Sequence, residues 1–266
     1  MDLEAYLNRI GFTRPIAPDR RTLVGLIQAH LRTVPFENLD QQLGVEVSTQ
    51  LDRVYEKVVT RQRGGWCFEL NGLFGWLLKE IGFEVSMIAG HVGPNRPPSR
   101  VGGDHMSLLV ECDGSLLVDV GFGGGPNEVI PVQPITVSQP PYTISIRRES
   151  DGFYKYSEHA NRNESSFWFT LDNVDMSYFE RANHRLQSDP KSPFVRTLTA
   201  QRRLKNEHLV LRGLVKKTIN ETGTSTVQLT DEAALIECLN DDFNLDVPQI
   251  STIWSSLSQR HDALFR

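Results

Sequence analysis

Apolar side chains recur with a helical period in three stretches of the first third of the chain. The first covers residues 3–10, where the spacing is three and four residues. The second covers residues 18–31, with Pro18 suited to the first helical position, and it is expected to end before Pro35. The third covers residues 66–81. These patterns predict three helices.

The middle of the chain alternates with the two-residue period of strands. Two apolar runs, residues 106–112 and 115–123, flank Asp113-Gly114, which is a strong hairpin signal. Three shorter strands are predicted further along, at residues 142–147, 153–156 and 167–171. Proline and glycine separate them, as in a small barrel or sandwich.

The last third mixes both periods. Residues 208–219 and 224–229 predict a pair of strands, and Asp231 can cap a helix over residues 232–239. Helices followed by strands and then by a mixture indicate an α+β fold with segregated layers.

Composition and charge limit the class of protein. The chain has 266 residues, enough for a core of its own, and its net charge of −5 gives no electrostatic footprint for nucleic acid. The N-terminus lacks the apolar core of a signal peptide, and no apolar stretch is long enough to span a membrane. Three cysteines without Cys-x-x-Cys spacing argue against a disulfide framework. We therefore expect a reducing, cytoplasmic location with no membrane or nucleic-acid partner.

Cys67 is the sharpest candidate for chemistry. It follows Gly64 and Gly65, which permit a tight turn, and falls in the first turn of the third predicted helix. Free amide groups and the helix dipole at that position favour a thiolate, the nucleophilic form of cysteine. A small buried cysteine that only packs is the alternative, and position alone does not separate the two.

A cysteine nucleophile needs a base and a group that orients the base. His105 opens the first strand of the predicted hairpin, and Asp119 lies near the end of the second, where a buried charge needs a partner. A two-residue turn would pair Leu108 with Asp119 and point the aspartate away from His105. The two meet only if a bulge, a longer loop or strong twist intervenes. A surface histidine and a strand-end aspartate bonded to local backbone are the alternatives.

A glycine-rich segment follows directly, at residues 121–126 (GFGGGP). It lacks the Lys-Ser/Thr of a nucleotide-binding loop, although its backbone amides could cradle a pyrophosphate. A glycine-rich exit from a strand is the favoured interpretation. The spacings typical of metal ligands are missing from the sequence, so no metal site is expected.

Taken together, several segments resemble the arylamine N-acetyltransferase family. They are residues 34–39 (VPFENL), 63–71 (RGGWCFELN), the stretch around His105, residues 119–123 (DVGFG) and residues 192–194 (SPF). The similarity covers about residues 1–200 and is thin beyond them.

The resemblance implies a helical N-terminal bundle, a central β-barrel and a C-terminal α/β lid around a cysteine-protease-like catalytic core. Along this chain the division falls at residues 1–85, which carry the nucleophile, 86–190, which carry the histidine and aspartate, and 191–266.

The resemblance also implies a reaction. Acetyl-coenzyme A would acetylate Cys67, and an arylamine, arylhydrazine or hydrazine would then remove the acetyl group in a ping-pong sequence. His105 would act as general base and acid, with Asp119 orienting it. The family pattern places substrate-binding residues at Phe36 and Phe122, and coenzyme A contacts at Gly123 and Gly124.

Charged residues near the nucleophile are expected to brace it. Arg63 and Glu69 flank Cys67 closely enough to suggest structural work, and Glu37 and Asn38 are expected to hydrogen-bond nearby.

Two rival functions stay open: a cysteine hydrolase or transglutaminase-like amidase with the same triad, and a catalytically inert binding protein of the same fold.

Overall fold

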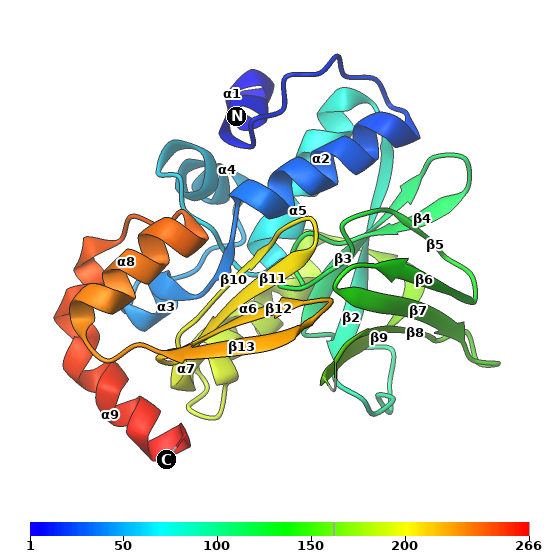
Figure 1. The fold of residues 1–266 in the computed structure, drawn as a ribbon. Coiled ribbons are helices and arrows are strands. Elements are labelled where there is room, and N and C mark those ends of the chain that lie inside the picture. Colours follow the sequence, from blue (N-terminus) through cyan, green and yellow to red (C-terminus); the bar gives the residue numbers. More distant parts are fainter. Residues whose placement is uncertain (162, 266) are drawn as a thin grey trace.

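The computed structural model describes residues 1–161 and 163–265 of the chain (Figure 1). Its N-terminal part is helical and comprises α1 (Leu3–Arg9), α2 (Arg20–Thr33), α3 (Leu39–Gln42), α4 (Leu51–Tyr55), the π-helix η1 (Glu56–Thr60) and α5 (Cys67–Ile81). The predicted helix start at Pro18 is wrong by two residues. Asp19 is the N-cap, because its carboxylate accepts the Thr22 N–H at 2.7 Å, so the helix begins at Arg20.

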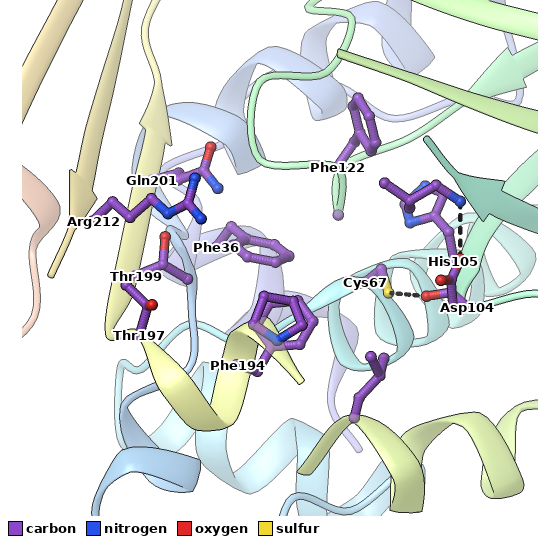
Figure 2. Close-up of a pocket in the computed structure, with 14 residues that line it drawn as sticks. Phe36, Cys67, Asp104, His105, Phe122, Phe194, Thr197, Thr199, Gln201 and Arg212 are labelled. Carbon is purple, nitrogen blue, oxygen red and sulfur yellow. Dashed lines mark hydrogen bonds between the residues drawn. The ribbon is translucent and has the colours of Figure 1, made fainter. Parts of the chain in front are cut away.

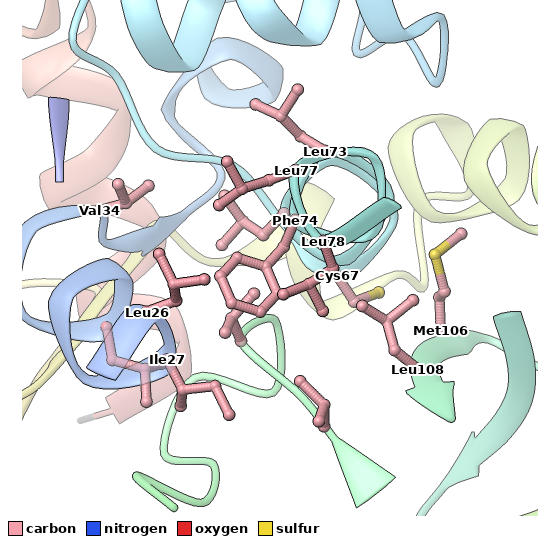
Figure 3. Close-up of a cluster of buried hydrophobic side chains, with 14 of the residues drawn as sticks. Leu26, Ile27, Val34, Cys67, Leu73, Phe74, Leu77, Leu78, Met106 and Leu108 are labelled. Carbon is pink, nitrogen blue, oxygen red and sulfur yellow. The ribbon is translucent and has the colours of Figure 1, made fainter. Parts of the chain in front are cut away.

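Helix α5 forms the centre of the main core. Its apolar face, which includes Leu73, Phe74 and Leu77, is fully buried. Figure 3 shows these side chains with Leu26 of α2 and Leu108 of the barrel around them. The helix that carries Cys67 is therefore fixed along its length by packing on both sides.

Eight strands form one antiparallel sheet in the order β5-β4-β3-β2-β9-β8-β7-β6, which curls into a nearly closed barrel (Figure 1). The strands are β2 (Glu84–Val92), β3 (His105–Glu111), β4 (Ser115–Val118), β5 (Ile130–Pro131), β6 (Ile135–Gln139), β7 (Tyr142–Arg148), β8 (Tyr154–Ala160) and β9 (Asn163–Val174). Apolar and aromatic side chains fill its interior, among them Ile144, Tyr156, Phe167 and Phe169.

The register predicted for the β3–β4 hairpin is wrong by one residue. Glu111 pairs with Ser115, so the loop holds three residues instead of two, and Leu108 faces Val118. Asp113 and Gly114 in this loop both have positive φ, at 53° and 105°. The extra residue turns Asp119 toward the side of the sheet that carries His105.

The C-terminal part pairs a second sheet with helices. The sheet has the order β1-β10-β11-β12-β13. Its strands are β1 (Phe36–Glu37), β10 (Thr199–Arg203), β11 (Glu207–Arg212), β12 (Val215–Asn220) and β13 (Gly223–Gln228). The helices are η2 (Met176–Phe179), α6 (Glu180–Ser188), α7 (Pro193–Arg196), α8 (Glu232–Phe243), η3 (Pro248–Ile253) and α9 (Trp254–Phe265). One face of the sheet, with Ala200 and Leu211, packs in a core with Leu235 and Leu239 of α8.

Two predictions in this part have clear outcomes. The single strand expected over residues 208–219 is wrong, because Gly213, with φ of 59°, turns the chain between β11 and β12. The helix capped by Asp231 is confirmed, since its carboxylate accepts the Ala234 N–H at 2.9 Å, and it runs on to Phe243.

The short strand β1 links the N-terminal part of the chain to the C-terminal sheet. In β1, Phe36 pairs with Gln201 of β10 and also makes a bridge to Gly65, just before the nucleophile candidate. The N-terminal segment thus lies between the turn that holds Cys67 and the C-terminal sheet. The division at residues 85 and 190 stays a prediction.

Candidate active site

Cys67 is the first residue of α5, at the end of a turn that only glycine permits. A side chain at Gly64 would collide with the Pro35 carbonyl, and one at Gly65 would lie 2.6 Å from a Glu69 oxygen. Glu69 in turn accepts the Trp66 N–H at 3.0 Å, which fixes the residue before Cys67. The sulfur is therefore held at a helix start, where free N–H groups favour negative charge.

The structure brings Cys67, His105 and Asp119 together in one buried group. His105 Nε2 lies 2.6 Å from Asp119 Oδ2, and the imidazole also interacts with the Cys67 sulfur. The exposed fractions are 4%, 2% and 0%, in that order. Figure 2 shows the sulfur and the imidazole at the wall of a pocket, with the carbonyl of Asp104 3.9 Å from the sulfur. The three side chains thus lie in the order that a candidate nucleophile, its base and an orienting carboxylate would need.

Asp119 has three further hydrogen-bond partners besides His105. Its Oδ1 accepts from Asn71 Nδ2 and from the Gly121 N–H, each at 2.9 Å, and its Oδ2 accepts from Ser107 Oγ at 2.6 Å. Neither Asn71 nor Ser107 is assigned a role by the sequence pattern. A signal for Asn71 exists, since it lies four residues after Cys67 and so on the same face of the helix.

These contacts set the protonation of the pair. Burial acts to lower the pKa of His105, but the charge of Asp119 and the hydrogen bond to it outweigh burial and raise that pKa to about 10. Burial acts to raise the pKa of Asp119, yet His105, Asn71 and Ser107 together hold it below its usual value. At neutral pH the pair is therefore an imidazolium and a carboxylate.

A second buried group of charges lies around the turn that leads into Cys67. Arg63 and Glu69 do not pair with each other. Arg63 donates to Glu37 at 2.9 Å and pairs with Asp40 at 3.0 Å. Glu69 pairs with Lys57 at 2.9 Å, and Lys57 reaches Asp40 at 3.2 Å. The five side chains form one network that ties β1, α3, η1 and the start of α5 together.

The pocket at Cys67 has a volume of about 510 Å³. Phe36 and Phe122 both line it, together with Phe194 from the far side (Figure 2). Asn38 fixes this far side, because its amide donates to the Phe194 and Thr197 carbonyls at 2.8 and 2.9 Å. An aromatic ring can thus lie between aromatic side chains with its substituent at the sulfur.

A second cavity of about 560 Å³ adjoins the first. It lies between the barrel and the face of the C-terminal sheet that α8 does not cover, and Phe122, Gln201 and Arg212 line both cavities. Gly124 is at its wall, whereas Gly123 contacts Gln201. Arg212 and Lys217 line it without an acidic partner within ion-pair distance in the described ranges.

Within residues 1–161 and 163–265, no three His, Cys, Asp or Glu side chains gather closely enough to hold a metal ion. None of the helices in the described part of the chain is both long and apolar enough to cross a membrane.

The chain is similar to known proteins both in sequence and in structure. A family model described as N-acetyltransferase matches residues 19–252. The arylamine N-acetyltransferase of Mycobacterium tuberculosis (strain ATCC 25618 / H37Rv) is 34% identical over 265 residues, which cover 94% of this chain and 91% of that protein. Human arylamine N-acetyltransferase 1 is 34% identical over 218 residues, covering 73% and 75%. The structure of Mycobacterium marinum arylamine N-acetyltransferase in complex with CoA matches with a TM-score of 0.86 and 28% identity, over 99% of both chains.

Proposed function

This chain belongs to the arylamine N-acetyltransferase family, and from that membership we propose that it moves an acetyl group from acetyl-coenzyme A to the nitrogen of an arylamine, arylhydrazine or hydrazine, through a thioester on Cys67. The observation that carries the proposal is the buried contact of Cys67, His105 and Asp119 at the wall of an aromatic pocket. The three free cysteines of the chain suit a reducing, cytoplasmic setting.

In the first half-reaction the thiolate of Cys67 attacks the acetyl carbonyl carbon. The bond from that carbon to the sulfur of coenzyme A then breaks, and His105, present as imidazolium, donates its proton to the departing sulfur. The products are acetyl-Cys67, free coenzyme A and a neutral imidazole. Asp119 holds the ring in place throughout and stabilises its charged form.

In the second half-reaction the amine nitrogen attacks the thioester carbonyl. His105 now accepts a proton from that nitrogen, and the carbon–sulfur bond breaks to return the Cys67 thiolate. The cycle ends with the imidazolium and the thiolate restored, so no proton or electron is left over. The acceptor ring would lie between Phe36 and Phe122.

The donor would extend into the second cavity. Arg212 and Lys217 face that cavity from adjacent strands and lie diagonally across the β11–β12 pair, since Lys217 is opposite Val210. Diagonal neighbours in a sheet are about 7–8 Å apart, a span that suits two linked phosphates. Gly124 lines the same cavity, as expected for a segment near the phosphates of coenzyme A.

The test is the intact mass of the protein after incubation with acetyl-coenzyme A alone. We expect a gain of one acetyl group, which Cys67→Ala abolishes and an arylamine or hydrazine discharges. Cys112→Ala is the matched control, because Cys112 lies in the β3–β4 loop outside the pocket, and its variant should be acetylated like the wild type. An unmodified wild type at neutral pH refutes acetyl transfer and makes a hydrolase or an inert binding protein the leading alternative.

A further inference from the structure

A buried carboxylate stands beneath the glycine-rich loop and takes no part in the mechanism above. Glu158 lies on β8 opposite Ile144, so it points into the barrel interior, and only 3% of its surface is exposed. Tyr156, two residues earlier on the same face, donates its hydroxyl to Glu158 Oε2 at 2.9 Å. An acid in this position needs partners, since burial of a charge is costly.

The other partner of Glu158 is the loop that follows Asp119. The backbone N–H of Gly125 acts to lower the pKa of the Glu158 carboxylate, against the effect of burial. A side chain at Gly124 would lie 2.5 Å from Glu158 Oε1, so the loop backbone rests directly on the acid. Two separate observations thus place the carboxylate against this segment.

The loop carries Phe122, which lies at both the pocket and the proposed base. The Phe122 ring is 5.3 Å from the His105 ring and 5.7 Å from the Tyr156 ring, edge to face in both cases. Tyr156 therefore contacts Phe122 with its ring and Glu158 with its hydroxyl. The loop is held at one end by Asp119, through the Gly121 N–H, and packs against Glu158 at Gly124.

We propose that Glu158 is a positioning residue that fixes the Phe122 wall of the acceptor pocket through its contacts with Gly124 and Tyr156, and so sets the selectivity for aromatic acceptors. The inference rests on the proposed function, because it assigns the acceptor ring to the Cys67 pocket. Glu158 touches neither the sulfur nor the imidazole in any contact described above, so its effect is expected on acceptor binding. A small acceptor without a ring should not sense it.

Ionisation adds a second readout. Burial raises the pKa of Glu158 to about 7, while the bonds from Tyr156 and Gly125 act in the opposite direction. Above that pH the carboxylate accepts both donors, and below it one oxygen carries a proton. Other titratable or charged groups lie around Glu158: Asp119 and Arg203 act on it electrostatically, Tyr142 is on β7, and His208, Arg212, Lys217 and Glu164 line the same cavity.

The experiment compares Glu158→Gln with Glu149→Gln, a control that removes an exposed carboxylate from the β7–β8 turn of the same hairpin. Each variant is pre-acetylated with acetyl-coenzyme A, and its discharge is measured with aniline and with hydrazine. We expect Glu158→Gln to raise KM for aniline about tenfold, the lower end for loss of a charged hydrogen bond. Glu158 also lines the second cavity, which the donor would occupy, so acetylation is completed before the comparison begins. Discharge of the acetyl-enzyme by hydrazine should stay within about twofold of the wild type, as for the control.

The pH profile separates positioning from general damage. For the wild type, kcat/KM for aniline should rise as pH passes about 7, and this rise should be missing in Glu158→Gln. Tyr156→Phe should move the midpoint to higher pH, because it removes a donor that favours the charged form. If Glu158→Gln does not fold, this shift carries the test alone, and an unmoved midpoint overturns the proposal.

Two other outcomes also overturn it: an aniline KM and pH profile in Glu158→Gln equal to the wild type, or equal losses with aniline and hydrazine. Failure of the underlying function looks different, because the wild type would then gain no acetyl group. A wild type that is acetylated, with a Glu158→Gln variant that matches it, removes only the inference.

Discussion

Asn71 is expected to stabilise the whole site, and Asn71→Ala tests this. The side chain is fully buried, and its amide contacts three backbone or side-chain groups on the barrel side. Nδ2 donates to Asp119 Oδ1 at 2.9 Å and to the Met106 carbonyl at 2.6 Å, while Oδ1 accepts the Val120 N–H at 2.9 Å. One residue of α5 thereby fixes both β3, which carries the proposed base, and the segment after β4 that carries its partner.

The cost of the substitution follows from these bonds. Alanine leaves the buried Val120 N–H without this acceptor, at about 1–3 kcal/mol. Loss of the bond to the Asp119 carboxylate adds about 1.5–3 kcal/mol. Asp119 keeps Ser107, Gly121 and His105 as partners, so no charge is left bare. We expect the free energy of unfolding to fall by about 3–5 kcal/mol, or Tm by about 10 °C for a chain of this size.

The assay is urea denaturation of Asn71→Ala beside Asn8→Ala, which removes an exposed asparagine from α1 and should change stability by less than about 0.5 kcal/mol. Alkylation of Cys67 by iodoacetamide at neutral pH gives a second readout, and it should slow as the base is less well placed. A loss below about 1 kcal/mol together with unchanged alkylation would refute the reasoning, because the buried bonds would then contribute little.

Three further perturbations have defined outcomes. The pKa of His105 is raised to about 10 and that of Asp119 is lowered, so the stability that their pairing contributes is complete near pH 6.5 and is lost as pH rises through about 10. The free energy of unfolding of the wild type should therefore fall over pH 7–10. The same fall should be missing in Asp119→Asn. Lys57→Met leaves two buried carboxylates without their shared cation and should cost about 3–5 kcal/mol in urea denaturation, whereas a near-zero loss would contradict the network. Gly124→Ala brings a methyl group onto Glu158 and should cost about 1–3 kcal/mol, and the added change Glu158→Ala should restore part of it if the clash is the cause.

Local sequence patterns predicted α1, α2, α5 and α8 for a physical reason, whereas the short helices α3, α4 and η1 were not predicted. The apolar stripe over residues 66–81 can be buried only as one helix face, and Gly64 and Gly65 leave few other ways to enter it. The helix start at Asp231 was predictable for the same reason, since its carboxylate caps a backbone N–H only three residues away.

Structure that depends on distant partners was not predictable from spacing. The β3–β4 register differs from expectation by a single residue, because Asp113 and Gly114 both adopt positive φ and Cys112 also joins the loop. Arg63 was expected to act beside Glu69, yet its partner is Glu37, 26 residues away. No periodicity encodes a charge pairing of that kind, because it arises only once β1 has packed against the turn that leads into α5.

The two-residue strand β1 has a consequence for the order of events during synthesis. Asn38, which follows it, bonds with Thr199 across 161 residues, and β1 has no sheet partner until β10 has been made. At about 5–20 residues per second a ribosome needs roughly 10–30 s to cover that distance. A nascent chain therefore carries Cys67 long before the far wall of its pocket exists. Chains that stop short of β10 retain the Cys67 thiol but lack the wall of the pocket that Thr199, Gln201 and Arg212 form.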